Sequence, residues 1–122
     1  MTSAGEVELA SAEAVLAGTA SERHRMACWL ARSALESAVD DLLVSSGWEP
    51  GSASMRSRLT VLQVLQDDPD VAAQAHYTWA RLSRACHQHS YDLSPTYAEV
   101  LDLLAQVADL CQLARKSAAD AG

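Results

Sequence analysis

Residues 21–44, SERHRMACWLARSALESAVDDLLV, carry the strongest helical pattern in the chain. Apolar or small residues recur there every three or four positions, which places them on one face of a helix. This face comprises Met26, Trp29, Leu30, Ala34, Ala38 and Leu42. Ser21 is of a residue type that caps helix N-termini, so the pattern predicts a helix from Ser21 to about Val44.

The segments on either side of this helix predict a shorter helix and a loop. We expect the shorter helix over residues 6–17, ending near Gly18, with a modest apolar stripe formed by Val7, Ala10, Ala14 and Val15. Two glycines and a proline lie within residues 45–52, which breaks the helical pattern and predicts a loop. Trp48 in this loop is expected to fold back onto the helices.

The second half of the chain predicts three more helices. Ser54 is the expected N-cap of a short helix whose buried face is Met55, Leu59, Leu62 and Leu65. Asp68 caps the next helix and Pro69 takes its first position, where proline is favoured. That helix carries Ala72, Ala75, Trp79, Leu82 and Cys86. Ser94-Pro95 repeat the same arrangement and open a last helix that runs to about Lys116.

The composition agrees with this all-helical pattern. Alanine and leucine dominate the 122 residues, phenylalanine is absent, and glycine and proline fall between the periodic stretches. We therefore expect an all-α, four- to five-helix up-and-down bundle. It forms a single domain over residues 1–122, with its core at about 21–116 and frayed ends at 1–5 and 117–122. The last helix is apolar over a wider face than one bundle needs, which predicts a homodimer.

Charge and cysteine content restrict the class of protein. The formal net charge of −7 argues against broad attraction to nucleic acid or to an anionic membrane. No apolar run approaches the roughly 18 residues of a membrane span, and residues 1–6 lack the pattern of a signal peptide. Three widely spaced cysteines, an odd number, predict reduced thiols. We expect a cytoplasmic protein with no membrane role.

The arginines leave two interpretations open. Eight of the nine basic residues are arginines, and seven of them fall into three groups: Arg23, Arg25 and Arg32; Arg56 and Arg58; Arg81 and Arg84. These groups are either scattered solvated charges or the lining of a shared groove. A local cationic groove would remain compatible with the acidic balance of the whole chain.

One octet, Arg84-Ala-Cys-His-Gln-His89-Ser-Tyr91, carries the densest chemistry. An arginine binds a phosphate through a fixed fork of donors, and a histidine moves protons near neutral pH. On an uninterrupted helix, Arg84 and His89 would be separated by a rise of about 7.5 Å and a rotation of about 140°, so they would not share a face. Unwinding near His87, or a two-fold dimer, would bring them together.

This Arg-x4-His-x-Tyr pattern resembles the signature of the HEPN superfamily of small helical domains. The amphipathic helix before it and Tyr97-Ala-Glu-Val-Leu-Asp-Leu-Leu after it extend the resemblance over about residues 23–113. The resemblance implies a metal-independent endoribonuclease, a toxin or antiviral effector that needs no cofactor. Arg84 would hold the scissile phosphate of the RNA, and His89 would act as general base or acid, leaving a 2′,3′-cyclic phosphate and a 5′-hydroxyl.

The resemblance also implies partners, and the chain departs from the family pattern at one position. Active sites in the family combine residues of two subunits, and Tyr91 matches a tyrosine that a partner nucleotidyltransferase, the antitoxin, modifies. Members of the family usually place a polar residue after the arginine, whereas this chain has Ala85. His87 would substitute in part. Of the acids on the helix over residues 21–44, Glu36 and Asp40 form a pair four residues apart, and Asp40 or Asp41 is the better candidate for an acid that orients Arg84 or His89.

Other interpretations of the same residues remain open. Arg84 fits a surface ion pair, His89 a favourable position at a helix C-terminus, and Tyr91 a packed turn. Trp29 and Trp79 fit core or dimer packing better than stacking on bases. Cys86, His87 and His89, with His76, would offer ligands to a metal. A different class, favoured by Ala85 and the net charge, is a non-catalytic helical module that binds nucleotides or a protein partner.

Overall fold

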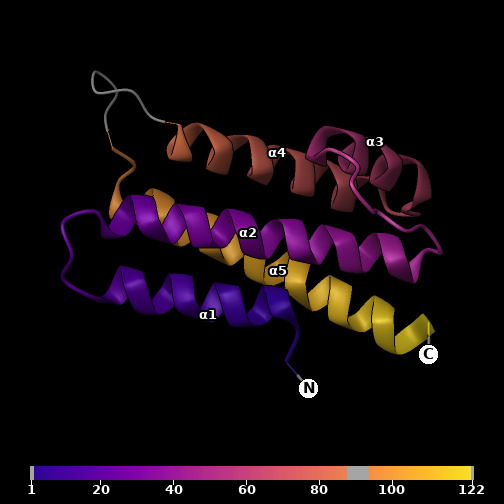
Figure 1. The fold of residues 1–122 in the computed structure, drawn as a ribbon, viewed down its shortest axis with the longest axis horizontal. Helices are drawn as coiled ribbons and strands as arrows, with labels where there is room; N and C mark the ends of the chain where they lie inside the picture. Colours follow the sequence, from indigo (N-terminus) through magenta and orange to yellow (C-terminus); the bar gives the residue numbers. More distant parts are fainter. Residues whose placement is uncertain (1, 88–93, 122) are drawn as a thin grey trace.

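The computed structural model describes residues 2–87 and 94–121, and over these ranges the chain forms five α-helices and no strand (Figure 1). The helices are α1 (Ala4–Ala17), α2 (Arg23–Ser45), α3 (Met55–Leu65), α4 (Pro69–Cys86) and α5 (Tyr97–Ala121). The expected all-α class and its four- to five-helix bundle are therefore confirmed. His89 and Tyr91 lie outside the described residues.

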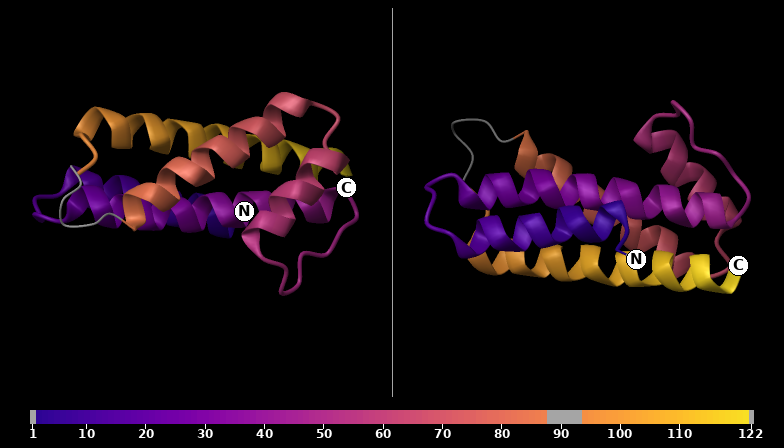
Figure 2. Two further views of the ribbon diagram at one scale, coloured as in Figure 1. Left: turned by 90° about the horizontal axis from the view of Figure 1, so that it is seen from above. Right: turned by 60° about the horizontal axis from the view of Figure 1, so that its bottom comes forward.

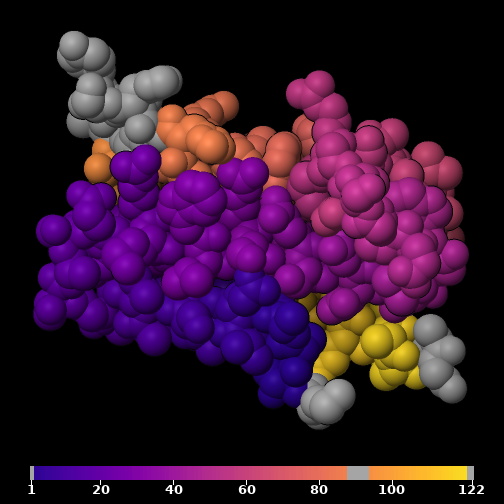
Figure 3. Space-filling view, viewed as in Figure 1, coloured from indigo at the N-terminus to yellow at the C-terminus, as the bar shows by residue number. Residues whose placement is uncertain are grey.

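The four long helices α1, α2, α4 and α5 alternate in direction, and the short α3 lies in the connection between α2 and α4 (Figures 1 and 2). Helix α2 contacts each of the other four helices and is the centre of the bundle. Helices α1 and α2 form the face shown in Figure 3, with α3 at one end of it. The segment with the strongest sequence pattern is thus the element on which the others pack.

Local capping explains where several helices begin. Ser54 accepts a hydrogen bond from the Ser57 N–H at 3.1 Å, and Asp68 accepts one from the Asp70 N–H at 2.9 Å, as the sequence predicts for α3 and α4. Helix α1 begins at Ala4, before the predicted position, because Ser3 and Glu6 form a capping box that the prediction missed.

Three predicted helix boundaries are wrong. Ser21 does not cap α2: Glu22 occupies the N-cap without a side-chain hydrogen bond. Ser94-Pro95 do not open α5, because Thr96 supplies the hydroxyl that accepts from the Glu99 N–H at 3.1 Å, and the helix begins at Tyr97. Helix α5 also continues past Lys116 to Ala121.

The buried face of α2 is only partly the predicted one. Ala34, Ala38 and Leu42 are buried as expected and Leu30 is half-buried, whereas Met26 and Trp29 are exposed. The core also takes Ala27, Cys28, Ala31, Leu35, Val39 and Leu43. Small side chains on this face allow α1 to approach closely: a Cβ added to Gly5 would lie 3.0 Å from the Ala34 carbonyl oxygen. Helix α1 buries Leu9, Ala12 and Leu16, not the predicted stripe, and extends the core beyond residues 21–116.

The wide apolar face of α5 is largely covered within one chain. Val100, Leu103, Leu104, Val107, Leu110 and Cys111 are all buried, and Leu101 is the exposed exception in that face. The width of the face therefore gives no argument for a second subunit, and the homodimer stays a prediction. Trp48 packs against the core, which confirms the expectation that it folds back.

Burial also determines the chemistry of the thiols. Cys28, Cys86 and Cys111 are free and buried, and burial raises the pKa of Cys28 and of Cys111 to about 11. These two thiols therefore stay protonated and weakly nucleophilic near neutral pH. Within residues 2–87 and 94–121, no helix combines the length and the hydropathy needed to cross a membrane.

Candidate functional site at the junction of α2 and α4

The octet begins at the exposed C-terminal end of α4. Arg84 lies in the last turn of this helix with its side chain exposed, and the helix ends at Cys86 with His87 as its C-cap. This end confirms the predicted interruption of the helix near His87. The predicted meeting of Arg84 with His89, and the role of Tyr91, depend on residues outside the described ranges.

His87 contacts an arginine of α2 that lies 55 residues earlier in the chain. Nη1 of Arg32 is 3.2 Å from Nε2 of His87. A guanidinium can only donate hydrogen bonds, so Nε2 of His87 is the acceptor and the ring proton resides on Nδ1. This contact leaves Nδ1–H of His87 as the hydrogen-bond donor of the ring.

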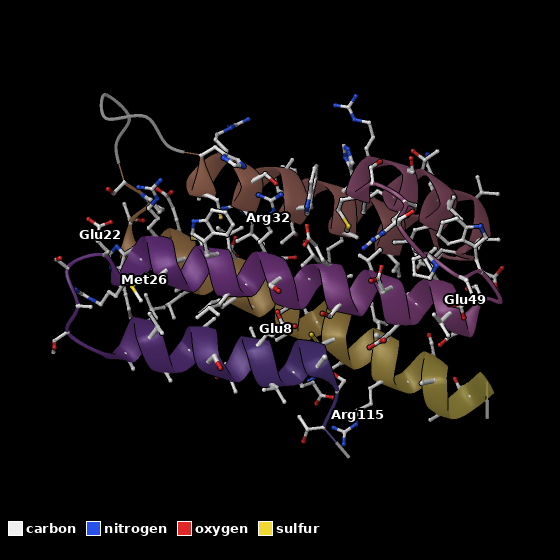
Figure 4. The ribbon with its side chains drawn as sticks, in the orientation of Figure 1. Glu8, Glu22, Met26, Arg32, Glu49 and Arg115 are labelled. Carbon is white, nitrogen blue, oxygen red and sulfur yellow. The ribbon has the colours of Figure 1, made fainter. Side chains whose placement is uncertain are left out.

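Arg32 is held by three further side chains. Its Nε lies 3.5 Å from Oε2 of Glu36, and the same carboxylate oxygen accepts a hydrogen bond from Nε1 of Trp79 at 3.2 Å. The guanidinium carbon lies 5.9 Å from the ring centroid of Trp29 and 5.6 Å from that of Trp79. Figure 4 shows the Arg32 side chain between α2 and α4. The cation is therefore fixed in the seam between these helices.

The start of α2 binds backbone on both sides of residues 88–93. Nη2 of Arg25 donates to the Cys86 carbonyl oxygen at 3.3 Å, and Nδ1 of His24 lies 3.1 Å from the Pro95 carbonyl oxygen. The carbonyl can only accept, so Nδ1 of His24 carries the proton. Two consecutive residues of α2 thus fix the last residue of α4 and a residue just before α5.

These contacts gather cations at one end of an acidic protein. Arg32 contacts His87 there, Arg25 binds the Cys86 carbonyl oxygen, and Glu36 is the acid bound to Arg32; Arg84 is exposed in the same last turn of α4. We call the residues Arg25, Arg32, Glu36, Arg84 and His87 the cationic junction. Arginines of the first and third sequence groups thus lie near the end of α4, and the predicted shared groove stays a prediction.

Two arginines of the second and third sequence groups have other partners. Arg81 binds Asp102 of α5 at 3.0 Å, and Arg58 of α3 binds Asp40 at 3.1 Å. Asp40, the predicted orienting acid, is therefore engaged with α3, and the structure does not bring it to Arg84. Burial raises the pKa of the Asp40 carboxyl, and the Arg58 cation opposes that effect.

The acid that lies in the cationic junction is Glu36, whereas the sequence favours Asp40 or Asp41. Glu36 follows Arg32 by four residues and Trp29 precedes it by three, spacings that place all three side chains on adjoining positions of one helix. That spacing is the feature of the sequence that points to Glu36.

The adjacent candidate metal ligands differ in exposure, since Cys86 is buried and His87 is exposed. Residues 2–87 and 94–121 contain no cluster of three residues that could hold a metal ion.

Comparison of the chain with protein-family models, with curated proteins and with solved structures finds no match. The class that fold and site define is a small all-α, five-helix domain with a cationic junction between its second and fourth helices.

Proposed function

We propose that this protein is a HEPN-like, metal-independent endoribonuclease of the cytoplasm, a toxin or phage-defence effector. The observation that carries the proposal is the presence of Arg25 and Arg32 of α2 at the end of α4 where the octet begins, with Arg84 exposed in the last turn of α4 and His87 as its C-cap. A chain of net charge −7 has little general attraction for RNA, so a local cluster of cations supports one defined phosphate-binding place. The free cysteines agree with a reducing compartment.

The chemistry follows the roles that the resemblance gives to the octet. Arg84 binds the non-bridging oxygens of the scissile phosphate and stabilises the charge that develops on them. His89 accepts the proton of the 2′-hydroxyl as the 2′-oxygen bonds to phosphorus. The bond from phosphorus to the 5′-oxygen breaks, and that oxygen takes a proton from the partner subunit's His89. The products are a 2′,3′-cyclic phosphate and a 5′-hydroxyl.

The same resemblance supplies the partners of the proposal. Two subunits form a homodimer in which each contributes Arg84 and His89 to a composite cleft. Tyr91 is the point at which a cognate nucleotidyltransferase antitoxin would attach a nucleotide, and the added charge and bulk would exclude RNA.

Cleavage of a mixed RNA pool tests the enzyme. The wild type and the Arg84→Ala/His89→Ala variant are compared in the presence of a chelator, with ends identified by their resistance to direct 5′ or 3′ ligation. Arg115→Ala, which removes an exposed arginine near the start of α1, is the matched control. We expect cleavage by wild type and control alone. Equal activity of the double variant and the wild type would refute the assigned roles.

One observation favours a second candidate function, a non-catalytic nucleotide-binding module. Ala85 is half-buried and packs against the core, so this position offers no polar group beside Arg84. Binding of a labelled oligonucleotide by folded protein that leaves the RNA pool intact would establish this function instead of the nuclease.

A further inference from the structure

Trp29 is a large aromatic side chain left in solvent beside the cationic junction. Half of its surface is exposed, at 50%, and Met26 one turn earlier is exposed by 46%. A tryptophan buries more apolar surface than any other side chain, so leaving it half in water costs stability that core packing would have supplied. Trp29 is therefore not a core residue of one chain, and its alternative role in dimer packing stays a prediction.

The surroundings of Trp29 are those of a ligand site. The His87 ring lies 6.2 Å from the indole, edge-on at 69°, and the Arg32 guanidinium carbon lies 5.9 Å from the indole centroid. His87 accepts from Arg32 through Nε2, so its Nδ1–H is the donor that the ring presents to other groups. The guanidinium of Arg32 thus positions both the planar indole of Trp29 and the Nδ1–H donor of His87.

We propose that Trp29, Arg32 and His87 form a nucleotide subsite that holds the residue of RNA adjoining the scissile phosphate. Its unpaired base stacks on the Trp29 indole, and Nδ1–H of His87 donates to a phosphate oxygen of the same nucleotide. Arg32 is a positioning residue, because its contacts with Glu36 and with both indoles fix the His87 ring. This subsite rests on the proposed function and specifies how the substrate is held.

Charge favours a nucleotide over a second copy of this chain as the occupant. A two-fold contact through Trp29 would place the same surface on both partners, so Arg25 and Arg32 of each would face like charges. A phosphate instead neutralises these cations. Tyr77 is a second exposed aromatic side chain beside an arginine: it is 63% exposed and lies 5.4 Å from the guanidinium carbon of Arg81, which is paired with Asp102 as Arg32 is with Glu36. Trp29 differs from it by the His87 ring beside its indole.

Binding of a short 2′-O-methyl RNA oligonucleotide, which lacks the nucleophile for cleavage, tests the subsite by fluorescence anisotropy. We expect Trp29→Ala to raise Kd about five- to 150-fold, the range of one stacked base, and Trp29→Phe to recover most of the affinity. Tyr77→Ala is the matched control and should leave Kd unchanged. An unchanged Kd for Trp29→Ala, or an equal effect of Tyr77→Ala, overturns the subsite.

Abasic oligonucleotides locate the stacked base. At one position, removing the base should raise Kd for wild type but add little to the effect of Trp29→Ala, because both changes remove the same contact. His87→Asn, whose amide can donate from near the Nδ1 position, should bind better than His87→Ala. Arg32→Ala should raise Kd and Arg32→Lys should restore it only in part, because lysine lacks the planar fork. If base removal and Trp29→Ala have additive effects on the binding free energy at every abasic position, no base stacks on Trp29 and the subsite is overturned.

The outcomes separate this subsite from the proposed nuclease. Binding that depends on Trp29 in a protein that cleaves no RNA supports the subsite and refutes the nuclease. Cleavage of RNA by a protein whose Kd does not depend on Trp29 supports the nuclease and overturns the subsite. A wild type that binds no oligonucleotide overturns both. A Trp29→Ala change that converts dimer to monomer in light scattering, with Kd unaltered, assigns this surface to a second copy of the chain and also overturns the subsite.

Discussion

Nη1 of Arg32, in the middle of α2, lies 3.2 Å from Nε2 of His87, the residue that ends α4. The same guanidinium lies beside Glu36 and between the rings of Trp29 and Trp79, so one cation joins the two helices through four side chains. Since hydrogen bonds to charged groups and cation–π contacts are stronger than neutral contacts, the exposed end of α4 is positioned by α2.

Arg32 should therefore contribute to stability far more than a surface arginine. Arg32→Ala removes the contacts with both indoles and leaves Glu36 without its cation, and we expect a loss of about 1–3 kcal/mol in the free energy of unfolding. The free energy of unfolding of Arg32→Lys should lie between those of the wild type and of Arg32→Ala. Chemical denaturation followed by far-UV circular dichroism measures both variants.

Arg115 is the matched control for that measurement. Its side chain is 64% exposed and lies 3.4 Å from the Glu6 carboxylate, an ion pair at the surface. Arg115→Ala should lower the free energy of unfolding by no more than about 0.5 kcal/mol. If the Arg32 and Arg115 variants lose the same amount, the Arg32 contacts do not join α2 to α4 as described.

Glu36 is the acid within the cationic junction, and its removal should strengthen the binding of RNA. In Glu36→Gln the amide oxygen still accepts from Trp79 Nε1, while the negative charge beside Arg32 is gone. We expect an affinity increase of roughly threefold at low salt, because repulsion of the phosphate is relieved. Glu13→Gln, an exposed change in α1, controls for net charge. Weaker binding by Glu36→Gln would show that the carboxylate is needed to hold Arg32.

Arg84 should act on RNA through charge. For single strands the dependence of log Kd on log salt has a slope of about 0.7 for each phosphate neutralised, so Arg84→Ala should lower that slope by roughly 0.7. Titrations of the uncleavable oligonucleotide at several salt concentrations measure it. Arg58→Ala gives the comparison, since Arg58 is bound to Asp40 and should leave the slope unchanged. An unaltered slope for Arg84→Ala would show that Arg84 does not contact a phosphate.

The sequence predicts those features that depend on residues close together in the chain. Ser54 and Asp68 cap α3 and α4 as expected, because a cap is a contact between residues two or three positions apart. For α2 the periodicity predicts the helix and the burial of Ala34, Ala38 and Leu42, but it does not decide which neighbouring stripe is also covered. Met26 and Trp29 are therefore predicted as buried although they are exposed.

In the candidate site, too, local features are predicted from the sequence and contacts between helices are not. The octet predicts an arginine at an exposed helix end, and Arg84 lies there. The contact of Arg32 with His87 joins residues 55 positions apart and depends on how α4 crosses α2, which no local pattern records. Asp40 was favoured over Glu36 for the same reason: both follow the helical spacing, and only the positions of α3 and α4 decide which arginine or indole each meets.

Gly5 should be intolerant of a side chain. In an unobstructed helix, alanine is more stable than glycine by about 0.5–1 kcal/mol. At Gly5 the added Cβ would lie 3.0 Å from the Ala34 carbonyl oxygen, which belongs to the buried backbone of α2. We expect Gly5→Ala to lower the free energy of unfolding by about 1 kcal/mol, as overpacking outweighs propensity. Urea denaturation measures it, with the exposed Ala10→Gly change reporting propensity alone. A stabilised Gly5→Ala would mean that α1 shifts away from α2.

The capping box of α1 should make stability depend on the charge of Glu6. Hydrogen bonds from the Ser3 backbone N–H and hydroxyl hold the pKa of the Glu6 carboxyl below its ordinary value of 4.5, and Arg115 adds to the effect. The folded protein thus binds this proton less tightly than the unfolded chain. The stabilisation is fully present above about pH 4.5 and is lost as the pH falls through the lowered pKa. Glu6→Gln keeps the geometry of the box without the charge. The difference in Tm between wild type and Glu6→Gln should therefore be larger at pH 7 than at pH 3, whereas Glu13→Gln should show no such change. A difference that is equal at both pH values would mean that the cap acts without its charge.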